Sequence, residues 1–146
     1  LGGFRTLQDN RFDTMPSDYA GLVLIGGMQW QSPEAERIFP IVQDAFEKGK
    51  VIGGICNAAS FLCAHGFLNH VKHTGNTLAV LKQWGREQYT NEDGYLEKQA
   101  VGDKNIVTAN GTGYLEFTRE LLLALKADTQ EKIEAFYDFS KNGLVR

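Results

Sequence analysis

The sequence predicts an α/β fold in which a mostly parallel, doubly wound sheet carries helices on both of its faces. Two observations predict this fold class. Short apolar runs that suit buried strands alternate along the chain with segments whose apolar residues recur at helical spacing. The length of 146 residues, with 42% hydrophobic and 23% charged residues, is that of one globular domain. We therefore expect the functional residues at the carboxyl ends of the strands.

Capping residues and glycines delimit the expected elements. Ser32, followed by a proline, Asn76 and Thr129 each stand where the N-cap of a helix is expected, and Gly66 suits a left-handed helix end. Asp93, followed by a glycine, is a strong hairpin signal. In chain order we expect strand 19–25, buried on both faces, helix 33–48, strand 50–55, helix 58–64, strand 72–74, helix 77–84, a small hairpin within 89–100, strand 106–109, and helices 115–125 and 130–139.

The charge and hydropathy of the chain exclude two classes of partner. Fifteen Lys and Arg residues against 18 Asp and Glu residues give a net charge of −3, which disfavours binding to nucleic acid. The apolar runs are far shorter than the roughly 18 residues of a membrane span, and the first residues show no signal-peptide pattern. Cys56 and Cys63 would lie about 10 Å apart along one helix, too far for a disulfide. We expect a cytoplasmic protein with free thiols.

Cys56 stands where the second buried strand is expected to pass into a helix. This arrangement imitates the nucleophile elbow of hydrolases, in which the residues two before and two after the nucleophile must be small. Gly54 and Ala58 meet that requirement. The N–H groups and the dipole at the start of the helix favour a thiolate, so we predict Cys56 as the catalytic thiol. The alternative is a small buried hydrophobic residue, which is how we interpret Cys63.

A pair of glycines, Gly26 and Gly27, ends the strand that precedes the elbow along the chain. Glycines at a strand end let a backbone N–H approach a ligand closely. The N–H groups of Gly27 and Asn57 are therefore predicted to form an oxyanion hole for a carbonyl that Cys56 attacks. An ordinary turn from strand to loop explains the two glycines equally well.

Other side chains near this edge of the sheet are candidates for lining a pocket. Trp30 follows the glycine pair, and Tyr114 and Glu116 begin the helix after a Gly-Thr-Gly sequence. Packing against the loop explains Trp30, and favourable charge in a first helical turn explains Glu116, without any ligand. The three histidines cluster within nine residues, but no Asp, Glu or Cys adds a ligand at zinc spacing, so we expect no metal.

Four stretches of the sequence together resemble one protein family. They are DYAGLVLIGG at 18–27, GKVIGGICNAASFLCAHGFLN at 49–69, KHTG at 72–75 and NGTGYLEFTRELL at 110–122. The ordered combination of glycine pair, cysteine elbow and glycine-rich helix start is similar to the ThiJ/PfpI group of the class I glutamine amidotransferase-like superfamily. The resemblance covers nearly the whole chain and implies a single domain over residues 1–146 with a flavodoxin-like sheet.

The sequence departs from this family at two positions. Family members carry an acidic residue at the end of a first strand, and it hydrogen-bonds the cysteine. This sequence begins after that strand, so the resemblance implies an N-terminally incomplete domain. Many members also have a histidine where Asn76 aligns here, and His73, three positions away, should face differently. Asn76 and His73 are therefore pocket candidates, and the late His-x-Glu pair of true glutaminases is absent.

The resemblance implies a cysteine-dependent hydrolase or amidase, or a glyoxalase-type lyase, acting on a small carbonyl or amide substrate through Cys56. The alternative, which the missing histidine favours, is a non-catalytic redox sensor or chaperone that uses the same cysteine. The resemblance also implies a homodimer. No cofactor is expected, because the sequence lacks the phosphate-binding loop of an FMN carrier. A companion peptide is expected to supply the missing first strand, since its absence would leave an open sheet edge and an apolar face.

Overall fold

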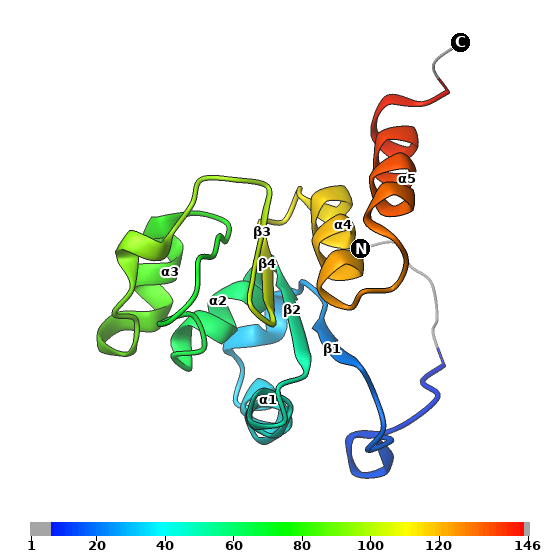
Figure 1. Cartoon of the computed structure of the whole chain (residues 1–146). Coiled ribbons are helices and arrows are strands. Elements are labelled where there is room, and N and C mark those ends of the chain that lie inside the picture. The colour runs from blue at the N-terminus through cyan, green and yellow to red at the C-terminus, as the bar shows by residue number, and fades with distance from the viewer. Residues whose placement is uncertain (1–6, 145–146) are drawn as a thin grey trace.

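A four-stranded sheet forms the centre of the computed structural model, which describes residues 7–144 (Figure 1). The strands are β1 (Gly21–Leu24), β2 (Val51–Ile55), β3 (Ala100–Asp103) and β4 (Ile106–Ala109), in the order β1-β2-β4-β3. β2 lies parallel to both β1 and β4, and β3 runs antiparallel to β4. This arrangement confirms the predicted α/β fold with a mostly parallel sheet.

Helices cover both faces of the sheet (Figure 1). They are α1 (Phe39–Glu47), α2 (Asn57–Ala64), α3 (Leu78–Gly85), α4 (Tyr114–Ala124) and α5 (Gln130–Asn142). α1 and α2 pack on one face, with α3 against α2, whereas α4 packs on the other face, with α5 against α4. The carboxyl ends of the three parallel strands therefore meet the start of α2 and of α4 at one edge of the sheet.

Two buried clusters hold these layers together. The larger cluster lies between the sheet and helices α1 and α2, where Ile52, Phe61 and Leu62 are almost completely buried. The smaller cluster lies under α4, where Val107 and Phe117 meet. Because side chains alternate between the faces of a strand, β2 contributes to both clusters, and its first four residues are all buried.

The prediction of a helix that begins directly after Ser32 is wrong for residues 33–38. Residues 28–31 and 35–38 form short 3-10 helices instead, and α1 begins only at Phe39. The indole N–H of Trp30 donates to the carbonyl of Ile25 at 2.9 Å, which ties this segment back to the end of β1. Pro40 then occupies the first turn of α1, where a missing backbone N–H costs no hydrogen bond.

The hairpin predicted at Asp93 and the strand predicted at 72–74 are also wrong. Residues 92–94 form a 3-10 helix, and His73 makes only an isolated parallel bridge with Tyr95. The backbone of His73 forms hydrogen bonds with groups that a hairpin at Asp93 would have paired with each other. Its N–H donates to the carbonyl of Gly94, and its carbonyl accepts from the N–H of Leu96. The small hairpin is instead β3–β4.

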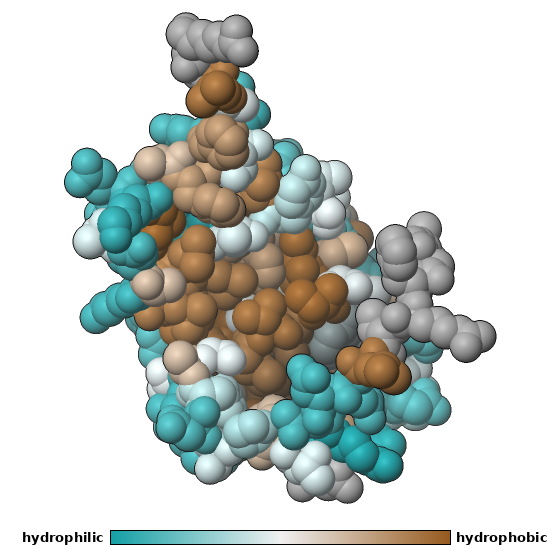
Figure 2. Space-filling view, turned by 90° about the vertical axis from the view of Figure 1, so that its right-hand side faces the viewer, coloured by the Kyte–Doolittle hydropathy of each residue, from teal (hydrophilic) through white to brown (hydrophobic). Residues whose placement is uncertain are grey.

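β1 is an edge strand of the described sheet, so the prediction that it is buried on both faces is wrong. Val23 is 40% exposed and Ile25 is 67% exposed, on the face of the molecule that also carries α4 and α5. Figure 2 shows a hydrophobic area in the middle of that face, bordered by hydrophilic side chains. The expected homodimer and the expected companion peptide stay predictions. No helix within residues 7–144 is both long and apolar enough to cross a membrane.

Candidate functional site at the β2–α2 elbow

Cys56 occupies a sharp turn between β2 and α2. Its backbone has φ 60° and ψ −128°, a conformation that residues with a side chain rarely adopt. The Cys56 N–H donates to the carbonyl of Ala109 at the end of β4, with a distance of 2.9 Å. Strained backbone of this kind persists only where surrounding structure holds it, and it concentrates at functional sites. The Cys56 side chain is partly exposed and unpaired with any disulfide partner, as a reactive thiol requires.

Small residues surround the elbow, as the sequence predicts. A Cβ added at Gly54 would come within 2.7 Å of Leu62 Cδ1 and 3.3 Å of the Ala58 backbone. Gly26, at the end of β1, lies directly against the Cys56 side chain, since a Cβ there would lie 2.9 Å from the Cβ of Cys56. The turn can therefore form only because these positions carry almost no side chain.

Asn76 lies against the thiol and does not cap a helix, so its predicted role as the N-cap is wrong. The cap of α3 is Thr77, whose hydroxyl oxygen accepts from the N–H of Val80 at 3.1 Å. The Asn76 Nδ2 instead donates to Cys56 Sγ at 3.5 Å and to the Asn57 Oδ1 at 3.2 Å. The structure thus brings Asn76 into direct contact with the candidate nucleophile.

The two predicted oxyanion-hole residues lie side by side. The side-chain Nδ2 of Asn57 donates to the carbonyl of Gly27 at 3.1 Å, which links the end of β1 to the start of α2. Asn57 is the first residue of α2, so its backbone N–H has no partner within the helix. Within residues 7–144, the Gly27 N–H makes no hydrogen bond either. Both donors are therefore available to a ligand.

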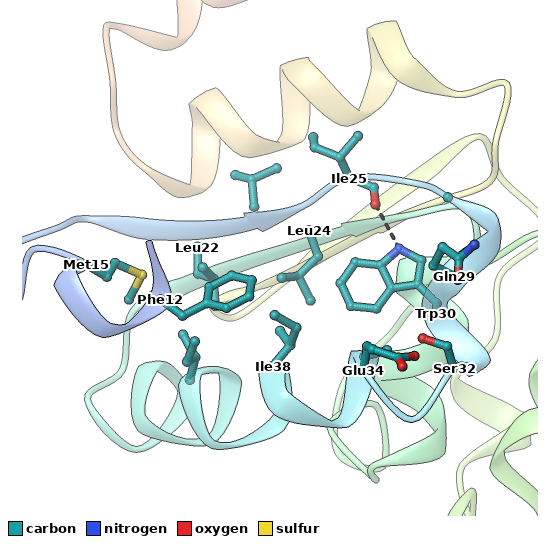
Figure 3. A pocket seen from close by; sticks show the side chains of 14 residues that line it. Phe12, Met15, Leu22, Leu24, Ile25, Gln29, Trp30, Ser32, Glu34 and Ile38 are labelled. Atoms are coloured by element: carbon teal, nitrogen blue, oxygen red, sulfur yellow. Dashed lines mark hydrogen bonds between the residues drawn. The ribbon is translucent and has the colours of Figure 1, made fainter. Parts of the chain in front are cut away.

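Trp30 forms one end of an apolar groove that runs along β1. Its indole ring packs on Phe61, with ring centroids 5.0 Å apart. Figure 3 shows the groove between β1 and the segment leading into α1, with Phe12 and Leu22 toward one end and Trp30 at the other. The groove has a volume of about 630 Å³, and Gly27 lines it at the Trp30 end.

His73, predicted as a pocket candidate, makes its side-chain contacts in the core and not with Cys56. Its ring is fully buried, with Nδ1 2.9 Å from the carbonyl of Val71 and Nε2 2.7 Å from the hydroxyl of Tyr89. Burial lowers the pKa of His73, and the bond to Val71 opposes that shift in part. A neutral imidazole held on both nitrogens serves the core and is not available to the thiol.

Replacing His73 with glutamine should flatten the acid dependence of stability. Because its folded pKa is lowered, the unfolded chain binds a proton near pH 6.5 that the folded chain does not bind. The free energy of unfolding of the wild type should therefore fall with pH below about 7, by at most about 1.4 kcal/mol per pH unit from this group. Urea denaturation at about pH 7.5 and about pH 5.5 measures both proteins. An identical loss of stability in the two would contradict the assignment.

Tyr114 and Glu116, the two pocket candidates on α4, lie in its first turn. Tyr114 is 64% exposed at the start of α4. The Glu116 carboxylate accepts from Tyr137 at 2.9 Å and from the Lys141 ammonium, both on α5. The Lys141 ammonium is the main cause that lowers the pKa of Glu116. Glu116 therefore fixes α5 to α4, which sequence reasoning about the helix start does not reveal.

Cys63 and His65 pack against neighbouring side chains. Cys63 is fully buried, as predicted, its Sγ donates to the Leu81 carbonyl at 3.4 Å, and burial raises its pKa to about 12. The His65 ring lies between those of Phe39 and Phe61, with centroids 4.7 and 4.4 Å away. No cluster of three or more His, Cys, Asp or Glu side chains suited to a metal ion occurs in the described part of the chain.

One residue of the site, Gly111, was not predicted from the sequence. A Cβ at Gly111 would come within 3.2 Å of Cys56 Sγ, and the Gly111 N–H donates to the Asn76 Oδ1 at 2.9 Å. The available signal was a glycine just after a predicted strand, the same signal that marks Gly27 at the end of β1. The loop after β4 thus closes the site from the side opposite β1.

Comparison with known proteins places this geometry in a family. Residues 1–124 match the DJ-1/PfpI family. The chain belongs to the DJ-1/PfpI family. Over 143 residues it is 40% identical to YdeA of Bacillus subtilis, which is named an uncharacterized protease, and the match covers 98% of this chain and 71% of YdeA. A second B. subtilis protein named an uncharacterized protease, YoaZ, is 32% identical over 97% of this chain and 67% of its own length.

Solved structures of DJ-1/PfpI proteins share the fold. A thiJ/pfpI family protein from Bacillus anthracis superimposes with a TM-score of 0.90 at 30% identity, over 98% of this chain and 68% of its own. A DJ-1 superfamily protein from Agrobacterium tumefaciens gives a TM-score of 0.76 at 34% identity, over 86% of this chain and 66% of its own. The chain therefore spans about two thirds of the length of these relatives.

Proposed function

We propose that this DJ-1/PfpI chain is a cysteine-dependent enzyme of the hydrolase, amidase or glyoxalase type, with Cys56 as its nucleophile. The observation that supports this proposal most directly is the position of Cys56. Its thiol stands on a strained, glycine-lined turn at the N-terminus of α2. Helix N-termini stabilise negative charge, and the thiolate is the form of cysteine that attacks electrophiles. The names of YdeA and YoaZ agree with a hydrolytic reaction.

In the proposed reaction, the Cys56 sulfur forms a bond to the carbonyl carbon of the substrate. The C=O electron pair moves to the oxygen, and the Gly27 and Asn57 N–H groups donate to the resulting oxyanion. With an amide or ester, the C=O bond re-forms, and the bond to the leaving group breaks as that group takes a proton from solvent water. A water molecule then hydrolyses the thioester to a carboxylic acid and the free Cys56 thiol. With an aldehyde, the adduct is a hemithioacetal. Trp30 closes the apolar side of the space next to Gly27.

Oxidation of the same thiol is a second candidate function. The observation that favours it is the partner of Cys56 Sγ, which is the neutral amide of Asn76 and not an imidazole. In this reaction the thiolate attacks hydrogen peroxide, the O–O bond breaks, one oxygen stays on sulfur as a sulfenic acid, and the other leaves as hydroxide, which takes a proton from the solvent to become water. The N–H groups of Gly27 and Asn57 would then stabilise the oxidised sulfur.

Selective alkylation tests the assignment of the reactive thiol. Iodoacetamide should modify Cys56 in the folded protein while Cys63, which is buried, reacts only after denaturation. Peptide mass mapping at several times distinguishes the two thiols. Equal labelling of both cysteines in the native protein would contradict the proposal. Methylglyoxal and small amide substrates, assayed with and without hydrogen peroxide pretreatment, then separate turnover from oxidation.

A further inference from the structure

We propose that Asn76 is a positioning residue that holds the Cys56 sulfur as a hydrogen-bond acceptor and so favours the thiolate without a titratable partner. The proposal deepens the function proposed above, since it concerns the same thiol. It assigns a specific role to a side chain that the sequence offers both as a helix cap and as a pocket candidate.

The orientation of the Asn76 amide follows from its contacts. The Gly111 N–H can only donate, so the atom that it meets at 2.9 Å must be the amide oxygen. The amide nitrogen therefore faces the other way, toward Cys56 Sγ at 3.5 Å and Asn57 Oδ1 at 3.2 Å. With three partners, the carboxamide cannot rotate without losing at least one hydrogen bond. Its N–H₂ group is thus fixed as a donor toward sulfur.

The same contacts join three separate segments around the thiol. Asn76 comes from the loop before α3, Gly111 from the loop after β4, and Asn57 from the start of α2. A Cβ on Gly111 would lie 3.2 Å from Cys56 Sγ, so the glycine leaves just enough room for the sulfur beside its backbone. The sulfur is therefore enclosed by an amide donor on one side and by glycine backbone on the other.

A neutral donor affects the thiol and the thiolate differently. Hydrogen bonds to a charged acceptor are roughly twice as strong as those to a neutral acceptor, so the Asn76 amide stabilises the thiolate more than the thiol. An imidazole in this place would titrate itself and add a second ionisation to any pH profile. With Asn76, the reactivity of Cys56 should rise with pH through a single ionisation.

The test replaces Asn76 with aspartate and measures the rate of iodoacetamide alkylation of Cys56 against pH. The aspartate side chain has the shape of asparagine and keeps an oxygen for the Gly111 N–H, but it faces the sulfur with a negative acceptor instead of a donor. The midpoint of the rate profile should move upward by about one pH unit or more, which is about a tenfold loss of rate on the acid side. Asn105→Asp is the matched control, because Asn105 donates to Gly49 at the opposite end of the sheet.

A second variant covers the case in which the charge in Asn76→Asp prevents folding. Asn76→Ala removes the donor without adding charge, and it should slow alkylation of Cys56 several-fold at a pH below the midpoint. A midpoint in either folded variant that equals those of the wild type and of Asn105→Asp would overturn the proposal. Alkylation reports on the thiol directly, so it decides the role of Asn76 even if no substrate is turned over. Loss of turnover in Cys56→Ser, by contrast, tests the proposed function alone.

Discussion

Replacing Cys56 with serine is expected to abolish turnover of carbonyl substrates, with a loss of about a thousandfold or more in kcat/KM and little change in Tm. A serine hydroxyl is a far weaker nucleophile than a thiolate unless a base removes its proton. The side chain that contacts Cys56 Sγ is the Asn76 amide, which cannot serve as that base. Steady-state kinetics with the substrates that the wild type accepts, together with thermal denaturation, provides the measurement.

Cys63→Ala is the matched control for this substitution. Cys63 lies on the same helix, is fully buried, and gives a hydrogen bond to the Leu81 carbonyl. Its removal should cost about 1 kcal/mol of stability and leave kcat/KM unchanged, because the site at the start of α2 does not contact it. Turnover by Cys56→Ser at the wild-type rate would remove Cys56 from the mechanism.

The elbow could be predicted because its requirements are local in sequence. A buried strand that leads into a helix through one residue fixes where Cys56 points, and the close approach of α2 to β2 fixes the small size of Gly54 and Ala58. The parallel part of the sheet was predictable for the same reason, since β1, β2 and β4 each carry their own apolar run, whereas β3 does not. Even so, the apolar run at 19–25 could not show that β1 is an edge strand. An edge strand differs from a central strand in which strands flank it, and the strand's own sequence does not reveal that.

Features that depend on contacts between distant residues could not be predicted. Asn76 and Thr77 both suit an N-cap, and Thr77 takes that place while Asn76 bonds Gly111, which is 35 positions away. The Asp93-Gly94 hairpin signal was overridden in the same way, because the backbone of His73 pairs with the segment that follows it. In both cases the residue type suits the predicted motif, but hydrogen bonds with residues distant in the sequence decide which structure forms.

Gly54→Val is expected to lower the free energy of unfolding by about 3 kcal/mol or more, or to prevent folding. The first added carbon alone would approach Leu62 Cδ1 to 2.7 Å and the Ala58 carbonyl carbon and oxygen to 3.3 Å. Leu62 is completely buried, so its side chain has little room to move away, and the Ala58 atoms belong to the backbone of α2. The helix must therefore shift from β2, which also displaces Cys56 at its first turn. Urea denaturation measures the loss of stability, and iodoacetamide alkylation measures the displacement.

Gly102→Val on β3 separates this clash from the general effect of a valine in a strand. Gly102 is exposed, and the nearest atom to an added Cβ is the Glu120 Oε2 at 2.9 Å, at the end of a flexible side chain. Valine favours strands more than glycine does, so this variant should be close to neutral in stability. A Gly54→Val protein within about 1 kcal/mol of Gly102→Val would show that α2 can move away from β2 at little cost. In that outcome the close packing of the elbow would not be what holds Cys56 in its strained conformation.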